Sequence, residues 1–219
     1  MMTSANSLET DFALKLTILG ETYAGKTCLV TRFLHYTFME IPSTTIGAAF
    51  VSKKIEALGK RVTLNIWDTD GSEQYQPLTK IYYRGARAAI LCYDLTERTS
   101  FDKIRYWVGE LQENEQHCRI YLCGTKKDLI DNDTRAVPRH KAEIIAHDLR
   151  TEHFETSSLT GENVEAVFQR IGEDYVRNMH SYPENQPKQE DDTKQAFHIG
   201  KSQEKGTTSS CALGSCFKR

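Results

Sequence analysis

The sequence lacks any apolar run that could cross a bilayer and any excess of charge of one sign. Its longest apolar stretches, such as residues 88–92, are far shorter than the roughly 20 residues that a membrane-spanning helix needs. Lys plus Arg is 28 and Asp plus Glu is 30, which gives a net charge of -2. Because no basic field is available to hold a polyanion, a nucleic-acid partner is not expected.

The spacing of the cysteines excludes two common uses of thiols. The chain has 6 Cys, with no CxxC pair and no Cys/His cluster that would indicate zinc. Four of them lie in apolar runs, which is typical of reduced thiols in a cytosolic protein: Cys28, Cys92, Cys118 and Cys123. Residue 2 is Met rather than Gly, and no basic patch precedes an apolar run, so neither myristoylation nor a secretion signal is expected.

Apolar runs of strand length alternate with helix-period stretches, which indicates an α/β fold built from parallel strands. The short link at residues 58–61 instead predicts a hairpin. We therefore expect a six-stranded mixed sheet, with five parallel strands and one antiparallel edge strand between helices on both faces. The expected strands are residues 14–19, 50–57, 62–67, 88–93, 119–123 and 153–156.

The helices are expected from apolar stripes at three- or four-residue spacing. Thr99 or Ser100 is predicted to cap one of them, and Pro138 suits the first turn of another. The stripes are Leu29 and Phe33; Phe101, Ile104, Trp107 and Leu111; Ala142, Ile145 and Leu149; and Val164, Phe168, Ile171 and Tyr175.

The composition divides the chain into three parts. Residues 1–12 form an N-terminal extension, and residues 13–180 carry the folded pattern. Residues 181–219 are rich in Pro, Glu, Gln, Lys, Ser and Thr, so they are predicted to be a disordered, hypervariable tail.

The strongest motif fits GxxxxGK[ST] and lies between the first expected strand and the first helix. Its glycines allow successive backbone N–H groups to wrap a phosphate at the positive end of a helix. Lys26 is expected to reach the outer phosphates, and the Thr27 hydroxyl to bind Mg²⁺. The motif is Gly20, Glu21, Thr22, Tyr23, Ala24, Gly25, Lys26 and Thr27, and Cys28 follows it in the expected nucleotide site.

Further residues complete a site for a nucleoside triphosphate on chemical grounds. Asp68 ends a strand, where a carboxylate can hold Mg²⁺ through water, although a strand-end Asp alone carries no significance. Gly71 supplies a flexible N–H, and Thr45 lies in a hydroxyl-rich segment that can close over the metal.

Four ordered motifs resemble small Ras-like GTPases, and within them the Rab family. They are residues 45–47, 67–73, 82–86 and 125–128, and the resemblance covers residues 13 to about 178. Together with Ala48, Ala49 and Ser72 it is similar to the divergent Rab subgroup linked with autophagy. The resemblance implies the Ras-like P-loop NTPase fold, GTP and GDP as ligands with Mg²⁺, and a switch that acts in vesicle transport.

Guanine selection is expected from Asp128, whose carboxylate can accept from both N–H groups of the guanine edge. The resemblance adds Phe38 and the stem of Lys126 beside the base, with Ser157 and Ser158 donating to it. Taken singly, each of these residues is better explained by a structural role, as a core Phe, a solvated Lys or a Ser pair before a helix.

Two departures from the family lie at the base. Thr125 stands at the usual Asn and Leu159 at the usual Lys, and each loses bonding or stacking worth about 1 kcal/mol. Faster nucleotide release than in typical relatives is therefore expected.

A third departure concerns catalysis, for which the resemblance implicates Lys26, Thr45 and residue 72. Ser72 stands at the usual Gln and is too short to orient the attacking water, although Gln74 could substitute. Thr22 crowds the γ-phosphate, so slow hydrolysis is expected. The rivals are a non-cycling GTP-bound scaffold and a P-loop nucleotide kinase, for which no Arg-rich lid is recognisable.

The tail places Cys216 fourth from the end, with Cys211 nearby, as in a prenylation box. The Lys and Arg that close the chain are atypical of such a box, so an unmodified end is the alternative. One lipid gives reversible attachment, and we expect a mainly cytoplasmic protein with weak association with endomembrane or autophagic vesicles.

The resemblance also implies effector, exchange-factor and GTPase-activating proteins as partners. Residues 41–49 and 71–83 are expected to order around the γ-phosphate. Ile46, Phe50, Trp67 and Tyr82 resemble the apolar patch that Rab proteins present to effectors, and they are equally half-buried sheet residues.

Overall fold

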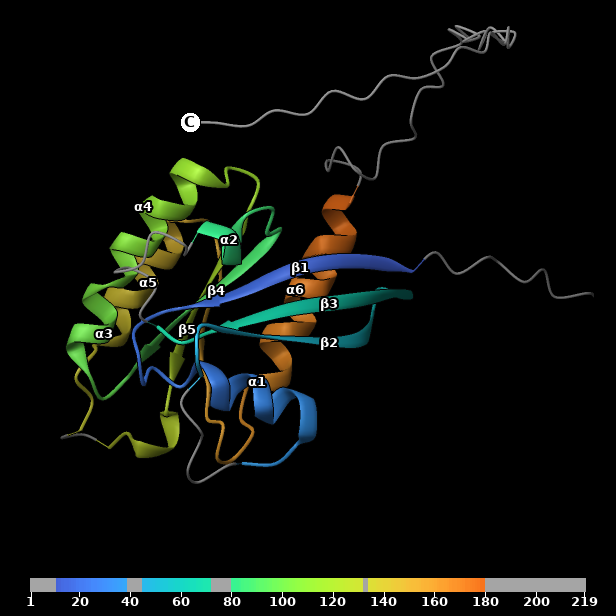
Figure 1. Cartoon of the computed structure of the whole chain (residues 1–219). Coiled ribbons are helices and arrows are strands. Elements are labelled where there is room, and N and C mark those ends of the chain that lie inside the picture. Colours follow the sequence, from blue (N-terminus) through green and yellow to red (C-terminus); the bar gives the residue numbers. More distant parts are fainter. Residues whose placement is uncertain (1–10, 39–44, 72–79, 132–133, 180–219) are drawn as a thin grey trace, which may run out of the picture. The chain divides into compact units, whose positions relative to one another are not determined.

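The computed structural model describes residues 11–38, 45–71, 80–131 and 134–179. In these residues a six-stranded sheet has the order β2-β3-β1-β4-β5-β6 (Figure 1). β2 is antiparallel to β3 at one edge, and the other pairs are parallel, which confirms the predicted mixed sheet. The strands are β1 Phe12–Leu19, β2 Ala48–Ala57, β3 Lys60–Thr69, β4 Ala88–Asp94, β5 Arg119–Thr125 and β6 His153–Glu155.

The hairpin between β2 and β3 is tighter than the predicted four-residue link. Ala57 pairs with Lys60, so only Leu58 and Gly59 form the turn. Both have positive φ, at 50° and 72°, which is the geometry that keeps the twist of a two-residue hairpin.

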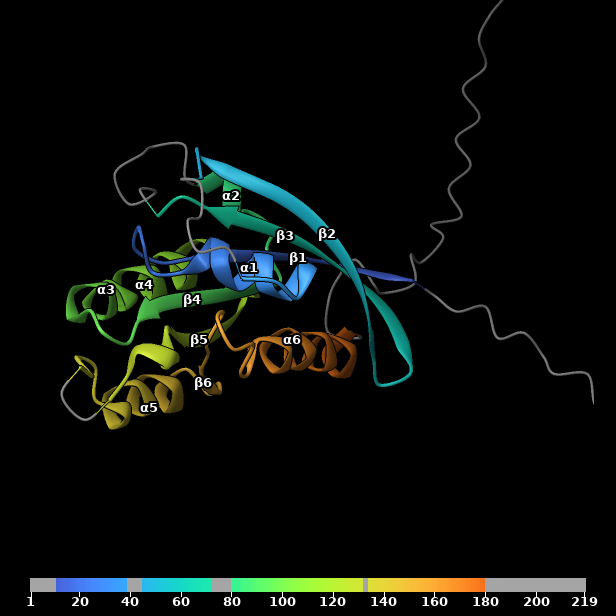
Figure 2. The same cartoon turned by 90° about the horizontal axis from the view of Figure 1, so that it is seen from below.

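Helices cover both faces of the sheet, as predicted. Figure 1 shows α3, α4 and α5 on one side and α1 and α6 on the other, and Figure 2 gives the view from below. Each side has its own apolar core, because alternate residues of the central strands point to opposite faces. The helices are α1 Lys26–His35, α2 Lys80–Tyr83, α3 Arg98–Asp102, α4 Ile104–Asn114, α5 Arg139–Asp148 and α6 Val164–Asn178, and a 3-10 turn spans Lys127–Leu129.

The predicted N-cap at Thr99 or Ser100 was wrong. The apolar stripe from Phe101 to Leu111 is shared by two helices, α3 and α4. The helix is interrupted at Lys103, which lies between them. The cap of α3 is Glu97, whose carboxylate accepts from the Thr99 N–H at 3.2 Å. Ser100 is buried and its hydroxyl donates to the Glu97 carbonyl, so it cannot cap the helix. Pro138, predicted for the first turn of a helix, is the N-cap residue of α5 and so stands one residue earlier than expected.

The remaining predictions concern the cysteines, the C-terminal tail and membrane-spanning helices. The four cysteines of the described residues are free thiols, with Cys92 and Cys123 buried and Cys28 and Cys118 half-buried. The predictions for the tail at residues 181–219 lie outside the described residues. Among the described helices, none has the length and apolar character needed to cross a membrane.

Candidate nucleotide site

A cavity of about 460 Å³ lies where the carboxyl ends of β1, β3 and β5 meet, which is where open α/β sheets bind ligands. Loops and strand ends far apart in sequence come together around it. Its lining consists of Thr22, Tyr23, Gly25, Lys26, Thr27, Cys28, Phe38, Thr45, Thr69, Asp70, Thr125, Lys126, Asp128, Leu129, Ser158 and Leu159.

The loop between β1 and α1 requires glycine at both ends of its motif. Gly20 has φ 141°, and a Cβ there would lie 2.2 Å from the Cys92 carbonyl oxygen. Gly25 has φ 78°, and a Cβ would lie 3.2 Å from the Thr125 hydroxyl. The close approach of neighbouring strands therefore fixes the curve of the loop ahead of the N-terminus of α1.

Lys26 begins α1, and its ammonium lies across the opening of this loop. Only 4% of the residue is exposed, and Nζ donates to the carbonyl oxygens of Gly20 and Glu21, each at 2.9 Å. A buried positive charge at the positive end of a helix is stabilised by an anion, so this arrangement is complementary to a phosphate.

The three predicted metal ligands come together beside Lys26. The hydroxyl oxygens of Thr27 and Thr45 are 2.8 Å apart. Asp68 is 3% exposed, and its Oδ1 has no hydrogen-bond partner among the described residues. Burial raises the pKa of Asp68 to about 6, although the Thr27 hydrogen bond and the Lys26 charge lower it. Two hydroxyls and an unpartnered carboxylate oxygen suit a hard cation such as Mg²⁺.

The end of β3 closes onto the phosphate loop at Gly71. With φ 91°, a Cβ on Gly71 would lie 2.4 Å from the Thr22 nitrogen and 2.6 Å from Lys26 Nζ. The Thr22 hydroxyl donates to the Asp70 carbonyl at 3.3 Å. Asp70 and Gly71, which follow β3, therefore lie directly against the phosphate loop. Ser72, the next residue, lies outside the described residues.

The base end of the cavity is held by pairs among its own residues. Lys126, with φ 59°, places Nζ 2.5 Å from an Asp94 carboxylate oxygen. The buried Ser157 donates its hydroxyl proton to Asp128 Oδ1 at 2.5 Å. These bonds fix the stem of Lys126 and the carboxylate of Asp128 before any ligand contributes to the site.

Thr125 does connect the base motif to the phosphate loop. Its buried hydroxyl donates to the Ala24 carbonyl at 2.8 Å and lies 3.1 Å from the Tyr93 carbonyl oxygen. A hydroxyl carries one proton, whereas a carboxamide carries two, so one strong bond replaces the fuller bridge expected of the family residue.

Of the remaining predicted site residues, some line the cavity and others lie behind the residues that line it. Tyr23 is 82% exposed at the mouth, and Phe38 and Leu159 are partly exposed. Residues behind the lining are Gly20, Glu21, Ala24, Asp68, Gly71 and Ser157. Three residues that line the cavity were not predicted from the sequence: Thr69, Asp70 and Leu129. For Leu129, the position directly after the base motif was the one feature of the sequence that indicated a place in the site.

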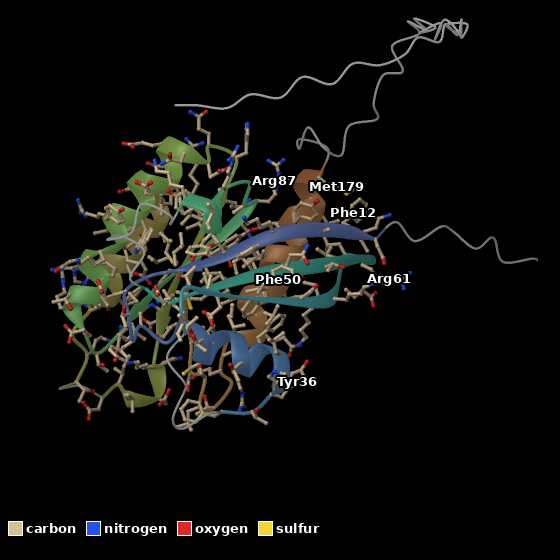
Figure 3. All side chains as sticks on the ribbon, viewed as in Figure 1. Phe12, Tyr36, Phe50, Arg61, Arg87 and Met179 are labelled. Atoms are coloured by element: carbon tan, nitrogen blue, oxygen red, sulfur yellow. The ribbon has the colours of Figure 1, made fainter. Side chains whose placement is uncertain are left out.

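The four residues of the expected effector patch separate by exposure. Ile46 is 94% exposed and Phe50, labelled on β2 in Figure 3, is 56% exposed. Trp67 and Tyr82 are half-buried. The Phe50 and Trp67 rings meet edge to face at 5.4 Å, and Trp67 lies 6.4 Å from Tyr82. Phe50, Trp67 and Tyr82 therefore form one aromatic surface.

Comparison with known proteins adds to this geometry. The model of the Ras family matches residues 15–177. The chain is 46% identical over 170 residues to the Ras-related protein Rab-24 of Dictyostelium discoideum, covering 77% of this chain and 84% of that protein. It is 41% identical to the GTP-binding protein YPT53 of Saccharomyces cerevisiae, over 73% of this chain and 75% of the relative. It is also 41% identical to the Ras-related protein Rab-4A of Bos taurus, over 77% of each chain.

Proposed function

Because the chain belongs to the Rab family of Ras-like small GTPases, which act in vesicle trafficking, we propose that it is a slow GTPase resting mainly in the GTP-bound state. The observation that carries the proposal is the position of Gly71 against Thr22 and Lys26. Residue 72 follows Gly71 directly in sequence, and the family uses the side chain at this position to orient the attacking water.

Hydrolysis requires a water to attack the γ-phosphorus in line with the leaving diphosphate, giving GDP and phosphate. Lys26 neutralises the outer phosphates, while Thr27, Thr45 and Asp68 would hold Mg²⁺, which offsets the charge that develops on the phosphate oxygens. Ser72 ends two heavy atoms closer to the backbone than the Gln amide it replaces. It therefore leaves the attacking water without the partner that the family supplies.

Single-turnover hydrolysis tests this assignment. Ser72→Gln should accelerate hydrolysis by roughly 100-fold or more, because a side chain positioned to assist proton transfer contributes roughly 10²–10⁴-fold. Ser52→Gln on β2 is the matched control, since its side chain is exposed and remote from the cavity. An unchanged rate in Ser72→Gln shows that the slow step has another cause.

The alternative function is a non-cycling, GTP-bound scaffold, and the hydroxyl of Thr22 at the γ-phosphate side favours it. Measuring the rate of GTP hydrolysis with and without a cell extract distinguishes the switch from the scaffold. A cycling switch hydrolyses bound GTP faster when the extract supplies a GTPase-activating protein, whereas a scaffold stays at its basal rate.

The cellular setting is part of the same proposal. The aromatic surface of Phe50, Trp67 and Tyr82 would present effectors of autophagic or endomembrane vesicles with an apolar anchor. A prenyl group on Cys216 or Cys211 would give weak, reversible membrane contact from a cytoplasmic pool. Mass spectrometry of the C-terminal peptide from eukaryotic cells shows whether either thiol is modified.

A further inference from the structure

A second cavity, of about 270 Å³, lies between α3–α4 and α5 and shares no residue with the nucleotide cavity. The three helices cover the same side of the sheet (Figure 1), with α4 against β4 and α5 against β5 and β6. We call this cavity the helical groove, and it is lined by Arg98, Phe101, Asp102, Arg105, Lys141, Ile144 and Ile145.

The groove has an apolar floor that continues to the surface. Phe101 is 5% exposed and belongs to the core, and Ile145 packs against the same core. Ile144 is 58% exposed on α5. An apolar side chain entering from outside could therefore bury surface against core residues without moving them.

The rim of the groove is cationic on both sides. Arg105 comes from α4 and Lys141 from α5, and both are exposed. Neither side chain makes an ion pair or hydrogen bond with another residue of the described ranges, and the backbone N–H of Lys141 donates to the Pro138 carbonyl. Asp102 is the acidic residue of the lining, and it is 3.0 Å from Arg98 Nε, so its charge is already matched. Arg98 also lies over the Phe101 ring, at 5.3 Å.

Two positively charged side chains without counter-charges, on facing helices, repel each other. An anion bound between them attracts both and replaces this repulsion with a net attraction. We propose that the helical groove binds an acidic segment of a partner protein, with an apolar side chain on the floor and flanking carboxylates on Arg105 and Lys141. The volume fits this occupant, because sites for small organic ligands are generally larger, roughly 300–1,000 Å³. A lipid headgroup would use the cations but leave the recessed floor unfilled.

The proposal goes beyond the nucleotide switch. No residue of the groove comes from the segments that are expected to respond to the γ-phosphate, residues 41–49 and 71–83. Binding is therefore expected with equal affinity in the GDP and GTP states, unlike that of an effector, which discriminates between them.

The test uses the full chain loaded with GDP and Mg²⁺, labelled with ¹⁵N, and the synthetic peptide acetyl-EDLFED-amide as probe. Chemical-shift changes should be confined to residues 98–105 and 141–145 and should weaken as salt rises. The charge-reversed peptide KKLFKK and the peptide EDGGED, which lacks the apolar pair, should each bind at least tenfold more weakly.

Variants separate recognition from folding. R105E combined with K141E should weaken peptide binding at least tenfold, and Ile144→Gln should weaken it severalfold. K60E, an exposed charge reversal in the hairpin, should leave it unchanged, and retained GDP shows that each variant is folded. An absence of shifts, an equal response to inorganic phosphate, or a response to phosphatidylserine vesicles but not to the peptide would each overturn the proposal, as would binding confined to the GTP state.

Discussion

The two ends of the nucleotide cavity differ in how their charged groups are partnered. At the phosphate end the carboxylate oxygen Asp68 Oδ1 is buried without a hydrogen bond among the described residues, and the Lys26 ammonium is folded back onto loop carbonyls. At the base end, Asp128 is held by Ser157 and Lys126 by Asp94. The phosphate end is thus completed by its ligand, while the base end is arranged before the ligand arrives.

This difference separates two tasks of the site. A buried carboxylate oxygen without a hydrogen bond destabilises the ligand-free fold, even with the Lys26 charge nearby. Mg²⁺ and phosphate should therefore stabilise the protein mainly through the phosphate end. A fixed carboxylate at the base end rejects a ligand that cannot match it, which gives specificity. Substitutions at the two ends should therefore have different signatures.

The largest effect is expected at the base end. Asp128→Asn keeps the bond from Ser157 but replaces one acceptor oxygen with an amide donor that faces the guanine N–H groups. GDP affinity should fall by roughly 100-fold or more, because a buried polar mismatch is strongly penalised. Xanthosine diphosphate, which carries a carbonyl there, should bind the variant better than GDP does.

Competition binding with GDP, XDP and ADP measures this change, with Glu113→Gln on α4 as an exposed control. If the variant keeps its preference for GDP over XDP, Asp128 does not read the base.

A smaller effect is expected at Asp68, where a substitution should weaken GTP binding but stabilise the Mg²⁺-free protein. Asp68→Asn should weaken Mg²⁺-dependent GTP binding by roughly 10- to 100-fold, since a neutral amide is a poor ligand for a hard cation. Without Mg²⁺ the same variant should be more stable than the parent by roughly 1–3 kcal/mol at pH 7, because the penalty of a buried ionised carboxylate is gone.

The pH dependence of that gain follows from the raised pKa. In the folded protein the pKa of Asp68 is about 6, whereas its ordinary value is 3.8, so the carboxyl group stays protonated to a higher pH than in the unfolded chain. Proton binding therefore favours the folded state below about pH 4, and this contribution is lost as the pH rises through 6. Thermal unfolding in EDTA should show the variant's advantage at pH 7 and none near pH 4. An advantage of equal size at both pH values would contradict the assigned cause.

The smallest effect is expected where the two ends are joined, at Thr125. Thr125→Val keeps the shape but loses the bond to the Ala24 carbonyl, so GDP release should accelerate by roughly fivefold. Thr125→Asn restores the second donor and should slow release relative to the parent. Release of a fluorescent GDP analogue measures both rates. If the two variants change the rate in the same direction, the hydroxyl bridge does not control release.

The sequence predicted what depends on local pattern. Strand positions and the stripe of α6 follow from periodicity, and all four residues of that stripe are buried. The break at Lys103 was not predictable in this way, because Phe101 and Ile104 keep helical spacing through it and both remain in the core. Ser100 was mistaken for a cap because its bond to Glu97 depends on the loop that follows β4.

At the site, the phosphate motif was readable because its chemistry is contiguous in sequence. The contact of Gly71 with Thr22, and the bond from Thr125 to Ala24, join residues 49 and 101 positions apart, so only folding brings them together. Thr69 and Asp70 line the cavity because β3 ends there, a boundary that the pattern placed two residues too early.

The most direct test of the account is the thermal stability of nucleotide-free protein with added Mg²⁺ and either GDP or ADP. Saturating GDP should raise the midpoint of unfolding by several degrees, because a ligand at about 100 times its Kd adds about 2.7 kcal/mol. ADP at the same concentration should raise the midpoint much less, since adenine leaves Asp128 unsatisfied and lowers the affinity. Equal stabilisation by both nucleotides, or by neither, would contradict the assignment of this cavity to guanine nucleotides.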